Sequence, residues 1–222
     1  MTKFVDEFWP AAGYDGAVML ELDHIAVAGA TLDEATEACE AALGVTLQPG
    51  GRHALFGTHN RLLGLADGLY LEAIATDPDA PEPERARLFG LDRFSGRARP
   101  TNWICRCDDL AAMLAHLPDG LGAPVALGRD DLRWLMSAPK DGVLPFDNCH
   151  PALIQWQSLT HPSAMLEDSG CRLRRLTVRH PEADSLQALL RPLLDDRRVM
   201  VETGAPALSA EFDTPHGTRL LE

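Results

Sequence analysis

The chain of 222 residues is long enough to bury a substantial core, and its 45% hydrophobic and 24% charged residues are ordinary for a globular protein. A formal net charge of −13 argues against nucleic acid or an anionic membrane as a partner, because phosphate contacts need clustered Lys and Arg. No apolar run approaches the roughly 20 residues that span a bilayer. Five cysteines without a tight framework favour a reducing compartment, so we expect a cytoplasmic protein.

Residues 1–20 are expected to form an N-terminal arm. Phe4, Val5, Phe8 and Trp9 are apolar, but acidic residues interrupt them and the segment has a single basic residue, Lys3. This pattern makes a poor secretory signal. The segment could be an ordered arm packed on the domain, or it could precede a true start at Met19.

The first predicted unit begins with a buried strand at 22–28. Thr31 is a plausible helix N-cap with Glu34 three residues later, and apolar residues then recur at helical spacing until Gly44 ends the helix. A short strand, a loop and two strands joined by a hairpin turn follow, at 45–47, 48–53, 58–65 and 69–75. The order of the unit is therefore βαβββ.

The same order of elements occurs twice more. The second unit has a strand at 102–107, a helix at 108–116 and strands near 125–127, 132–137 and 152–157. The third has a strand at 173–179, a helix at 182–194 and strands near 199–202, 207–212 and 218–221. A repeat of about 50 residues with one helix per copy indicates one supersecondary unit used three times. We predict an α+β fold of repeated βαβββ modules.

The module boundaries define the expected domain organisation. The modules at 21–78 and 100–160 should pair as one unit, 21–160, and the third should stand at 170–222. Residues 79–99 form the linker, which continues a proline-rich stretch and should contain a short helix at 84–91.

Equivalent strands of a repeat should carry equivalent site positions. The first and last strands of the first two modules match His24 with Trp103 and Glu72 with Gln155. Strand alternation predicts that His24 shares a face with Leu22 and Ala26, while Asp23 lies with Ile25 and Val27 on the face that the helix covers.

Several segments together resemble a known family. They are residues 22–27, 50–53, 57–62, 70–72 and 77–78 in the first module, and 132–135, 144–146 and 154–156 in the second. The chain resembles the vicinal-oxygen-chelate superfamily, and more closely its glyoxalase-like domain branch, well over 22–157 and weakly in the third module. The resemblance implies two modules whose sheets curl around a cleft, with any metal ligands on the first and last strands. It does not settle the reaction, because one fold hosts many chemistries.

The resemblance places His24, Glu72, Trp103 and Gln155 in that cleft. His24 and Glu72 suit a divalent metal such as Zn, Ni, Fe or Mn, and Gln155 could be a third, weaker oxygen ligand. Trp103 cannot ligate a metal, so one position is empty, and a single matched histidine disfavours extradiol cleavage. Without metal, His24 and Glu72 could instead form a satisfied buried pair.

The expected function is a glyoxalase-like small-molecule enzyme of lyase or isomerase type that acts on an oxygenated metabolite. Glu72 is the candidate catalytic base, which would move a proton on the carbon beside a polarised carbonyl. His59, Asn60 and Arg61 are candidate substrate-binding residues, with loop anchoring as the alternative. Trp103 is read as a wall of the pocket or as core packing. The alternative function is a metal-free binding or sequestration protein, and no organic cofactor is expected.

The third module raises the question of assembly. Such modules pair to cover their concave faces, and the third has no partner although its strands carry apolar residues, among them Leu208, Phe212 and Leu221. Either the N-terminal arm covers this face or two chains join through it. We expect a homodimer, with the arm helping to cover the join.

Overall fold

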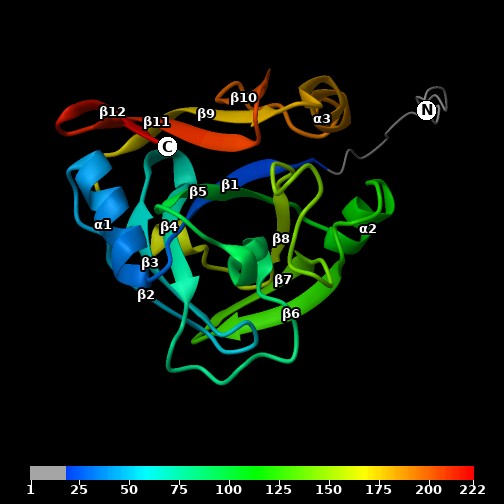
Figure 1. Cartoon of the computed structure of the whole chain (residues 1–222), viewed down its shortest axis with the longest axis horizontal. Coiled ribbons are helices and arrows are strands. Elements are labelled where there is room, and N and C mark those ends of the chain that lie inside the picture. Colours follow the sequence, from blue (N-terminus) through cyan, green and yellow to red (C-terminus); the bar gives the residue numbers. More distant parts are fainter. Residues whose placement is uncertain (1–18) are drawn as a thin grey trace.

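The strands of the computed structural model, which describes residues 19–222, form two sheets. One sheet has eight strands in the order β2-β3-β4-β1-β5-β8-β7-β6, and the other has four in the order β10-β9-β11-β12. The eight-stranded sheet curls into a half-barrel, and the smaller sheet lies across its outer face beside β1 and β5 (Figure 1). The predicted N-terminal arm lies almost entirely outside the described residues.

Each of the three modules has the predicted βαβββ order, which confirms the fold class. The first comprises β1 (Glu21–Ala28), α1 (Leu32–Leu43), β2 (Gln48–His53), β3 (Thr58–Gly64) and β4 (Tyr70–Thr76). The second comprises β5 (Arg99–Arg106), α2 (Leu110–Ala115), β6 (Ala123–Arg129), β7 (Leu132–Ala138) and β8 (Ala152–Trp156). The third comprises β9 (Arg172–His180), α3 (Ala183–Leu190), β10 (Val199–Thr203), β11 (Ala207–Thr214) and β12 (Gly217–Leu221). Short 3-10 turns are η1 (Ala66–Gly68), η2 (Leu88–Arg93) and η3 (Pro162–Ala164).

The first helix begins and ends as its sequence predicts. The Thr31 hydroxyl accepts a hydrogen bond from the Glu34 backbone N–H at 3.1 Å, and Gly44 ends the helix in the left-handed conformation with φ 74°. The helix buries Ala35 and Cys39 against the sheet. This placement leaves the other face of the first module free to form a site.

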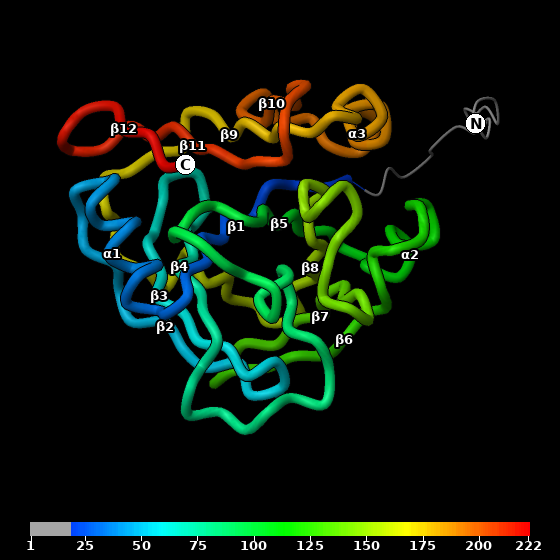
Figure 2. Tube along the Cα trace, in the orientation of Figure 1, coloured from blue at the N-terminus to red at the C-terminus, as the bar shows by residue number. Residues whose placement is uncertain are grey.

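Three elements differ from the prediction. Residues 45–47, expected as a short strand, lie outside the strands. Residues 48–53, expected as a loop because they contain Pro49-Gly50-Gly51, form the edge strand β2, with an irregular register between Pro49 and Arg52. Proline and glycine are tolerated in an edge strand that pairs on one side. The helix expected at 84–91 is instead the 3-10 turn η2, in which Phe89 and Gly90 have positive φ. Figure 2 shows the β4–β5 connection looping out below the large sheet and then folding back to its middle.

The first two modules join through their first strands. β1 pairs antiparallel with β5, while each of these strands pairs in parallel with the last strand of its own module. The pairing makes one continuous sheet and places both first strands at its centre. The edge strands β2 and β6 therefore face each other across the opening of the half-barrel.

The third module covers its apolar face within the same chain. Leu208, Phe212 and Leu221 are all buried, whereas Leu220 is exposed. The Cys149 thiol donates to the Arg179 carbonyl and the Leu20 N–H donates to the Leu193 carbonyl, so polar contacts join the module to the rest of the chain. The uncovered face that motivated a homodimer is thus absent from the described residues, and the homodimer itself stays a prediction.

Within residues 19–222 no helix is both long enough and apolar enough to cross a bilayer.

Candidate functional site

The inner face of the half-barrel encloses a small cavity of about 60 Å³. Its walls are mostly apolar and come from both modules, from η2 and from η3: Phe56, Leu62, Ile74, Leu88, Phe89, Leu91, Leu127, Leu132, Trp134, Met136, Ile154, Trp156 and Pro162. A few polar side chains interrupt them: His24, His53, Thr58, Asn60, Tyr70, Glu72 and Arg129. A mostly apolar pocket with a few polar groups is typical of a small-molecule site.

A β-bulge in β1 shapes one side of this cavity. Leu22 pairs with Cys105 and His24 pairs with Ile104, so Asp23 is an extra residue with no partner on β5. The bulge brings the Asp23 carboxylate to the side of His24, where its Oδ1 lies 2.5 Å from His24 Nδ1. The predicted placement of Asp23 on the helix side is therefore wrong, because strand alternation breaks at a bulge.

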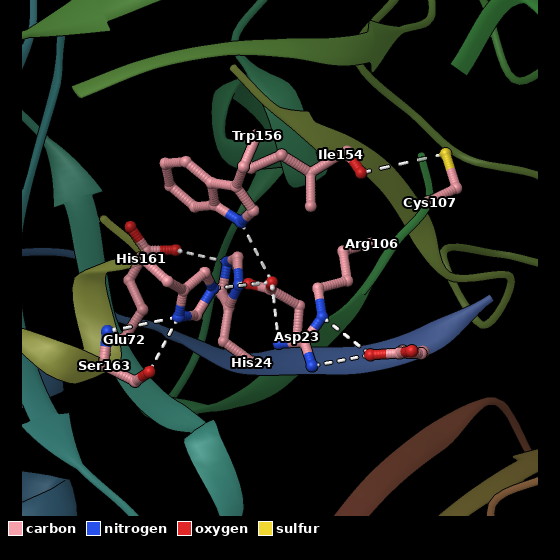
Figure 3. Close-up of polar contacts among 10 residues, drawn as sticks. Asp23, His24, Glu72, Arg106, Cys107, Ile154, Trp156, His161 and Ser163 are labelled. Atoms are coloured by element: carbon pink, nitrogen blue, oxygen red, sulfur yellow. Dashed lines mark hydrogen bonds and ion pairs between the residues drawn. The ribbon is translucent and has the colours of Figure 1, made fainter. Parts of the chain in front are cut away.

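Three further side chains converge on Asp23 (Figure 3). Its Oδ2 accepts a hydrogen bond from the indole N–H of Trp156 at 3.0 Å and lies 2.9 Å from His161 Nε2, and an Arg106 nitrogen lies 3.8 Å away. Burial alone would raise the pKa of Asp23, but the hydrogen bonds of His161 and His24 hold it well below its usual range. Asp23 is thus a buried, fully ionised carboxylate.

His24 lies between two carboxylates. Its Nδ1 faces Asp23, and its Nε2 lies 3.6 Å from Glu72 Oε2, while the Tyr70 ring stacks on the imidazole with 4.2 Å between centroids. Burial lowers the pKa of His24, but the interactions with Asp23 and Glu72 outweigh it and raise the pKa to about 9. His24 is therefore a cation at neutral pH, and its Nε2–H has no short hydrogen bond to Glu72.

Asn60 holds the Glu72 carboxylate in place. The Asn60 amide Nδ2 donates to Glu72 Oε1 at 2.6 Å, and its Oδ1 accepts from the Gly51 N–H at 2.7 Å. A Cβ at Gly50 would lie 2.1 Å from this Oδ1, so Gly50 leaves room for the amide. Burial raises the pKa of Glu72, but His24 and Asn60 together lower it below its usual value. Glu72 is ionised at neutral pH.

The segment from His59 to Arg61 contributes one of its three predicted binding residues to the cavity. Asn60 lines it, as do its strand neighbours Thr58 and Leu62 two positions away. His59 and Arg61 alternate to the opposite face of β3, where His59 Nδ1 lies 4.0 Å from Asp77. They therefore do not line this cavity, and their contact with a ligand stays a prediction.

Trp103 and Gln155 also lie away from the cavity. Trp103 is fully buried on the other face of β5, and its indole N–H donates to the Cys149 carbonyl at 2.8 Å. Gln155 Oε1 accepts from the Leu110 N–H at 3.0 Å, at the start of α2. Trp103 is thus a core residue, the second of its two predicted roles, and Gln155 caps α2 instead of serving as a third metal ligand, because both side chains point to the outer face of the sheet.

The helix-capping role of Gln155 can be tested by substitution. Gln155→Ala should lower the free energy of unfolding by about 1 kcal/mol, because α2 loses a partner for one of its first backbone N–H groups. Urea denaturation would measure this loss. If the variant instead lost a bound metal or ligand with unchanged stability, the capping role of Gln155 would be refuted.

The strand register identifies the true counterparts of His24 and Glu72. His24 pairs with Ile104 and Ala26 with Asn102, so the symmetry of this strand pair exchanges His24 with Asn102. Glu72 pairs with Ala26, and the residue paired in the same way with Ile104 is Ala152. The second module thus offers an amide and a methyl group where the first offers an imidazole and a carboxylate.

The donor set does not fit a divalent metal. Both His24 nitrogens face carboxylates, and Ala152, which stands in the second module where Glu72 stands in the first, cannot ligate. Among residues 19–222 no group of three or more His, Cys, Asp or Glu side chains could hold an ion. Catalytic metal sites usually need three protein ligands. We therefore derive no chemistry from a metal here.

Sequence reasoning missed Asp23, Trp156, His161 and Arg129. Trp156 and Arg129 line the cavity, and His161 binds Asp23 from the loop that follows β8. Asp23 is adjacent to His24 in the chain, and a carboxylate beside a histidine was the available signal. The long-range partners Trp156 and His161 left no local signal, because only the folded half-barrel brings them to β1.

Comparisons with known proteins agree with this architecture. A family model described as a glyoxalase-like domain matches residues 22–194. A solved structure of a hypothetical protein from Staphylococcus aureus has a TM-score of 0.62 and 15% identity, over 85% of this chain and 88% of that one. This likeness shows the fold.

Two further solved structures are similar at TM-scores below 0.5. Methylmalonyl-CoA epimerase from Mycobacterium tuberculosis has a TM-score of 0.43 and 21% identity, over 68% of this chain and 97% of that one. The Mn(II)-bound glyoxalase from Novosphingobium aromaticivorans has a TM-score of 0.49 and 8% identity, over 92% and 82%. No curated protein matches the chain.

Proposed function

Because the chain belongs to the glyoxalase-like domain family of the vicinal-oxygen-chelate superfamily, we propose that it is a small-molecule enzyme of isomerase or lyase type. The proposed substrate is an oxygenated metabolite with a hydrogen on the carbon beside a carbonyl. Glu72 is the base and His24 the acid. The observation that carries the proposal is the His24–Glu72 ion pair at the inner end of a mostly apolar cavity.

The proposed reaction begins with proton removal. A Glu72 oxygen takes the proton from the carbon, the C–H electron pair forms a carbon–carbon double bond, and the carbonyl electrons move to oxygen. The Nε2–H of His24 donates to that oxygen as negative charge develops on it, and Asp23 stabilises the imidazolium from the other side. Return of the proton to the other face of the carbon, or to a neighbouring carbon, completes an isomerisation.

The cationic His24 takes the role that a metal ion would otherwise have at the carbonyl. Its charge is maintained by two carboxylates, and its orientation by the stacked Tyr70 ring. The apolar walls exclude water, which strengthens the interaction between the imidazolium and the developing oxyanion. No step needs a co-reactant.

The lowered pKa of Glu72 favours a second candidate, a metal-free binding or sequestration protein. A carboxylate with a depressed pKa is a weaker base, and an ion pair can also bind the oxygen of a ligand without turnover. The two candidates differ in whether a proton leaves the ligand.

Solvent deuterium exchange separates the two candidates. The purified protein is incubated in D₂O, with EDTA, against small carbonyl compounds, and loss of the proton signal beside the carbonyl is followed by NMR. We expect catalysed exchange with at least one compound and no change in rate when EDTA is replaced by Mn²⁺ or Zn²⁺. Binding without exchange would favour the second candidate, and exchange that needs added metal would refute the metal-free mechanism.

We also propose a cytoplasmic location. All five cysteines are free and buried, which suits a reducing compartment.

A further inference from the structure

Arg129 lies where the edge strands β2 and β6 approach each other across the opening of the half-barrel. It is the last residue of β6, the edge strand of the second module, and it crosses to β2 and β3 of the first module. Its Nη1 donates to Asn60 Oδ1 at 3.3 Å, and a Cβ at Gly51 would lie 2.3 Å from its Cδ. The absence of a side chain at Gly51 thus provides the path by which the guanidinium reaches the cavity.

Arg129 has no ion pair with a carboxylate among the described residues. Some arginines have carboxylate partners, for example Arg87 with Asp92 at 2.7 Å and Arg106 with Glu21 at 2.6 Å. Others have no such ion pair among the described residues, but of the arginines in that part of the chain it is Arg129 that lines the cavity. Among residues 19–222, no carboxylate lies within ion-pair distance of Arg129, although the chain carries a net charge of −13. A half-buried cation that lines a cavity without an ion pair is suited to an anion that arrives from outside.

Arg129 also connects the cavity with a larger groove on the surface. The groove has a volume of about 740 Å³ and shares Leu62, Arg129, Leu132 and Pro162 with the cavity. A ligand that enters through the groove therefore passes the guanidinium before it reaches His24 and Glu72. The groove is also lined by Asp130, Asp131 and Arg133, and of its four charged residues Arg129 is the one that lines the cavity as well.

We infer that the ligand of this cavity is a short carboxylic acid with a carbonyl close to its carboxylate, an oxo acid with an apolar tail, and that Arg129 binds the carboxylate. The inference rests on the proposed function and names its substrate class. A single amide, that of Asn60, separates the guanidinium from the Glu72 carboxylate. The carboxylate and the reacting carbon of the ligand must therefore lie only a few bonds apart, and the apolar walls receive the remaining chain.

The test compares charged and neutral compounds of matched shape. Straight-chain 2-oxo acids of three to six carbons, including 2-oxopentanoate, are measured beside methyl 2-oxopentanoate and 2-pentanone. Deuterium exchange reports turnover, and saturation-transfer NMR reports binding. The methyl ester is chemically more acidic than the carboxylate at the carbon beside its ketone, so a preference for the acid would come from the protein. We expect the acids to bind and exchange at least tenfold better than the ester or the ketone.

Substitution assigns that preference to Arg129. Arg129→Met should raise KM for the acids roughly 10- to 100-fold with little change in kcat, and it should leave the ketone unaffected. Arg129→Lys keeps the charge but cannot donate two parallel hydrogen bonds to a carboxylate. Its KM for the acids should lie between those of the wild type and Arg129→Met. Arg175→Met, which removes an exposed arginine of the third module, is the matched control and should behave as wild type.

The outcomes distinguish this inference from the proposed function. Equal exchange of acid, ester and ketone would leave the function standing and overturn the role of Arg129. Binding of the acids without exchange, lost in Arg129→Met, would support the anion site and refute the enzyme. If no acid binds the wild-type protein, or if Arg129→Met and Arg175→Met behave alike, the inference is overturned.

Discussion

Replacing Glu72 by Gln should slow catalysed deuterium exchange by about 10²- to 10⁴-fold, the usual contribution of a positioned general base. The amide has the shape of the carboxylate and can still accept the Asn60 hydrogen bond through its oxygen. It cannot take a proton from carbon. The rate of exchange measured by NMR at saturating substrate would show the loss in kcat.

The control for this variant is Glu40→Gln. Glu40 lies on α1, and its Oε1 accepts from the Leu47 N–H, so the substitution makes the same chemical change outside the cavity. We expect it to retain full exchange. Unchanged turnover in Glu72→Gln, with ligand binding preserved, would exclude Glu72 as the base.

The free energy of unfolding should fall as the pH rises from about 6.5 to about 9, because of His24. The folded-state pKa of about 9 lies above the unfolded value of 6.5, so the stabilisation is fully present below pH 6.5 and is lost as the pH rises through 9. At 1.36 kcal/mol per pKa unit the loss is on the order of 3 kcal/mol. Urea denaturation at a series of pH values would measure it.

Two variants test whether His24 causes this slope of the free energy of unfolding against pH. His24→Gln should remove it, and Asp23→Asn should remove most of it, because the carboxylate that accepts from Nδ1 is gone. His216→Gln, at an exposed histidine of the third module, should leave the slope intact. A wild-type protein whose stability is constant between pH 6.5 and 9 would contradict a cationic His24.

The fold was predictable because its signals are local. Periodic apolar residues mark most helices and strands, and Thr31 and Gly44 mark the two ends of α1. The repeat of these elements gives the order of the modules. The position of the third module was not predictable in this way. Its apolar face could be covered by the arm, by another chain or by the large sheet, and all three solutions bury the same residues.

The candidate site was predictable in its first half only. His24 and Glu72 come together because β1 and β4 pair within one module, over a short stretch of chain. The second half depends on the register between β1 and β5, where Asp23 bulges. Matching the modules by strand order alone made Trp103 the counterpart of His24. Trp103 is one residue away from Asn102, and a shift of one residue moves a side chain to the opposite face of a strand.

The contacts that Trp156 and His161 make with Asp23 have a consequence for how the newly synthesised chain folds. Trp156 lies 133 residues and His161 lies 138 residues after the carboxylate that they bind. On the ribosome the whole first module is synthesised before either residue has left the exit tunnel. Until both arrive, Asp23 lacks two of its partners, so the first βαβββ unit has to fold around a carboxylate that water must still solvate. The full set of partners that hold Asp23 in place is therefore complete only when synthesis has passed the second module.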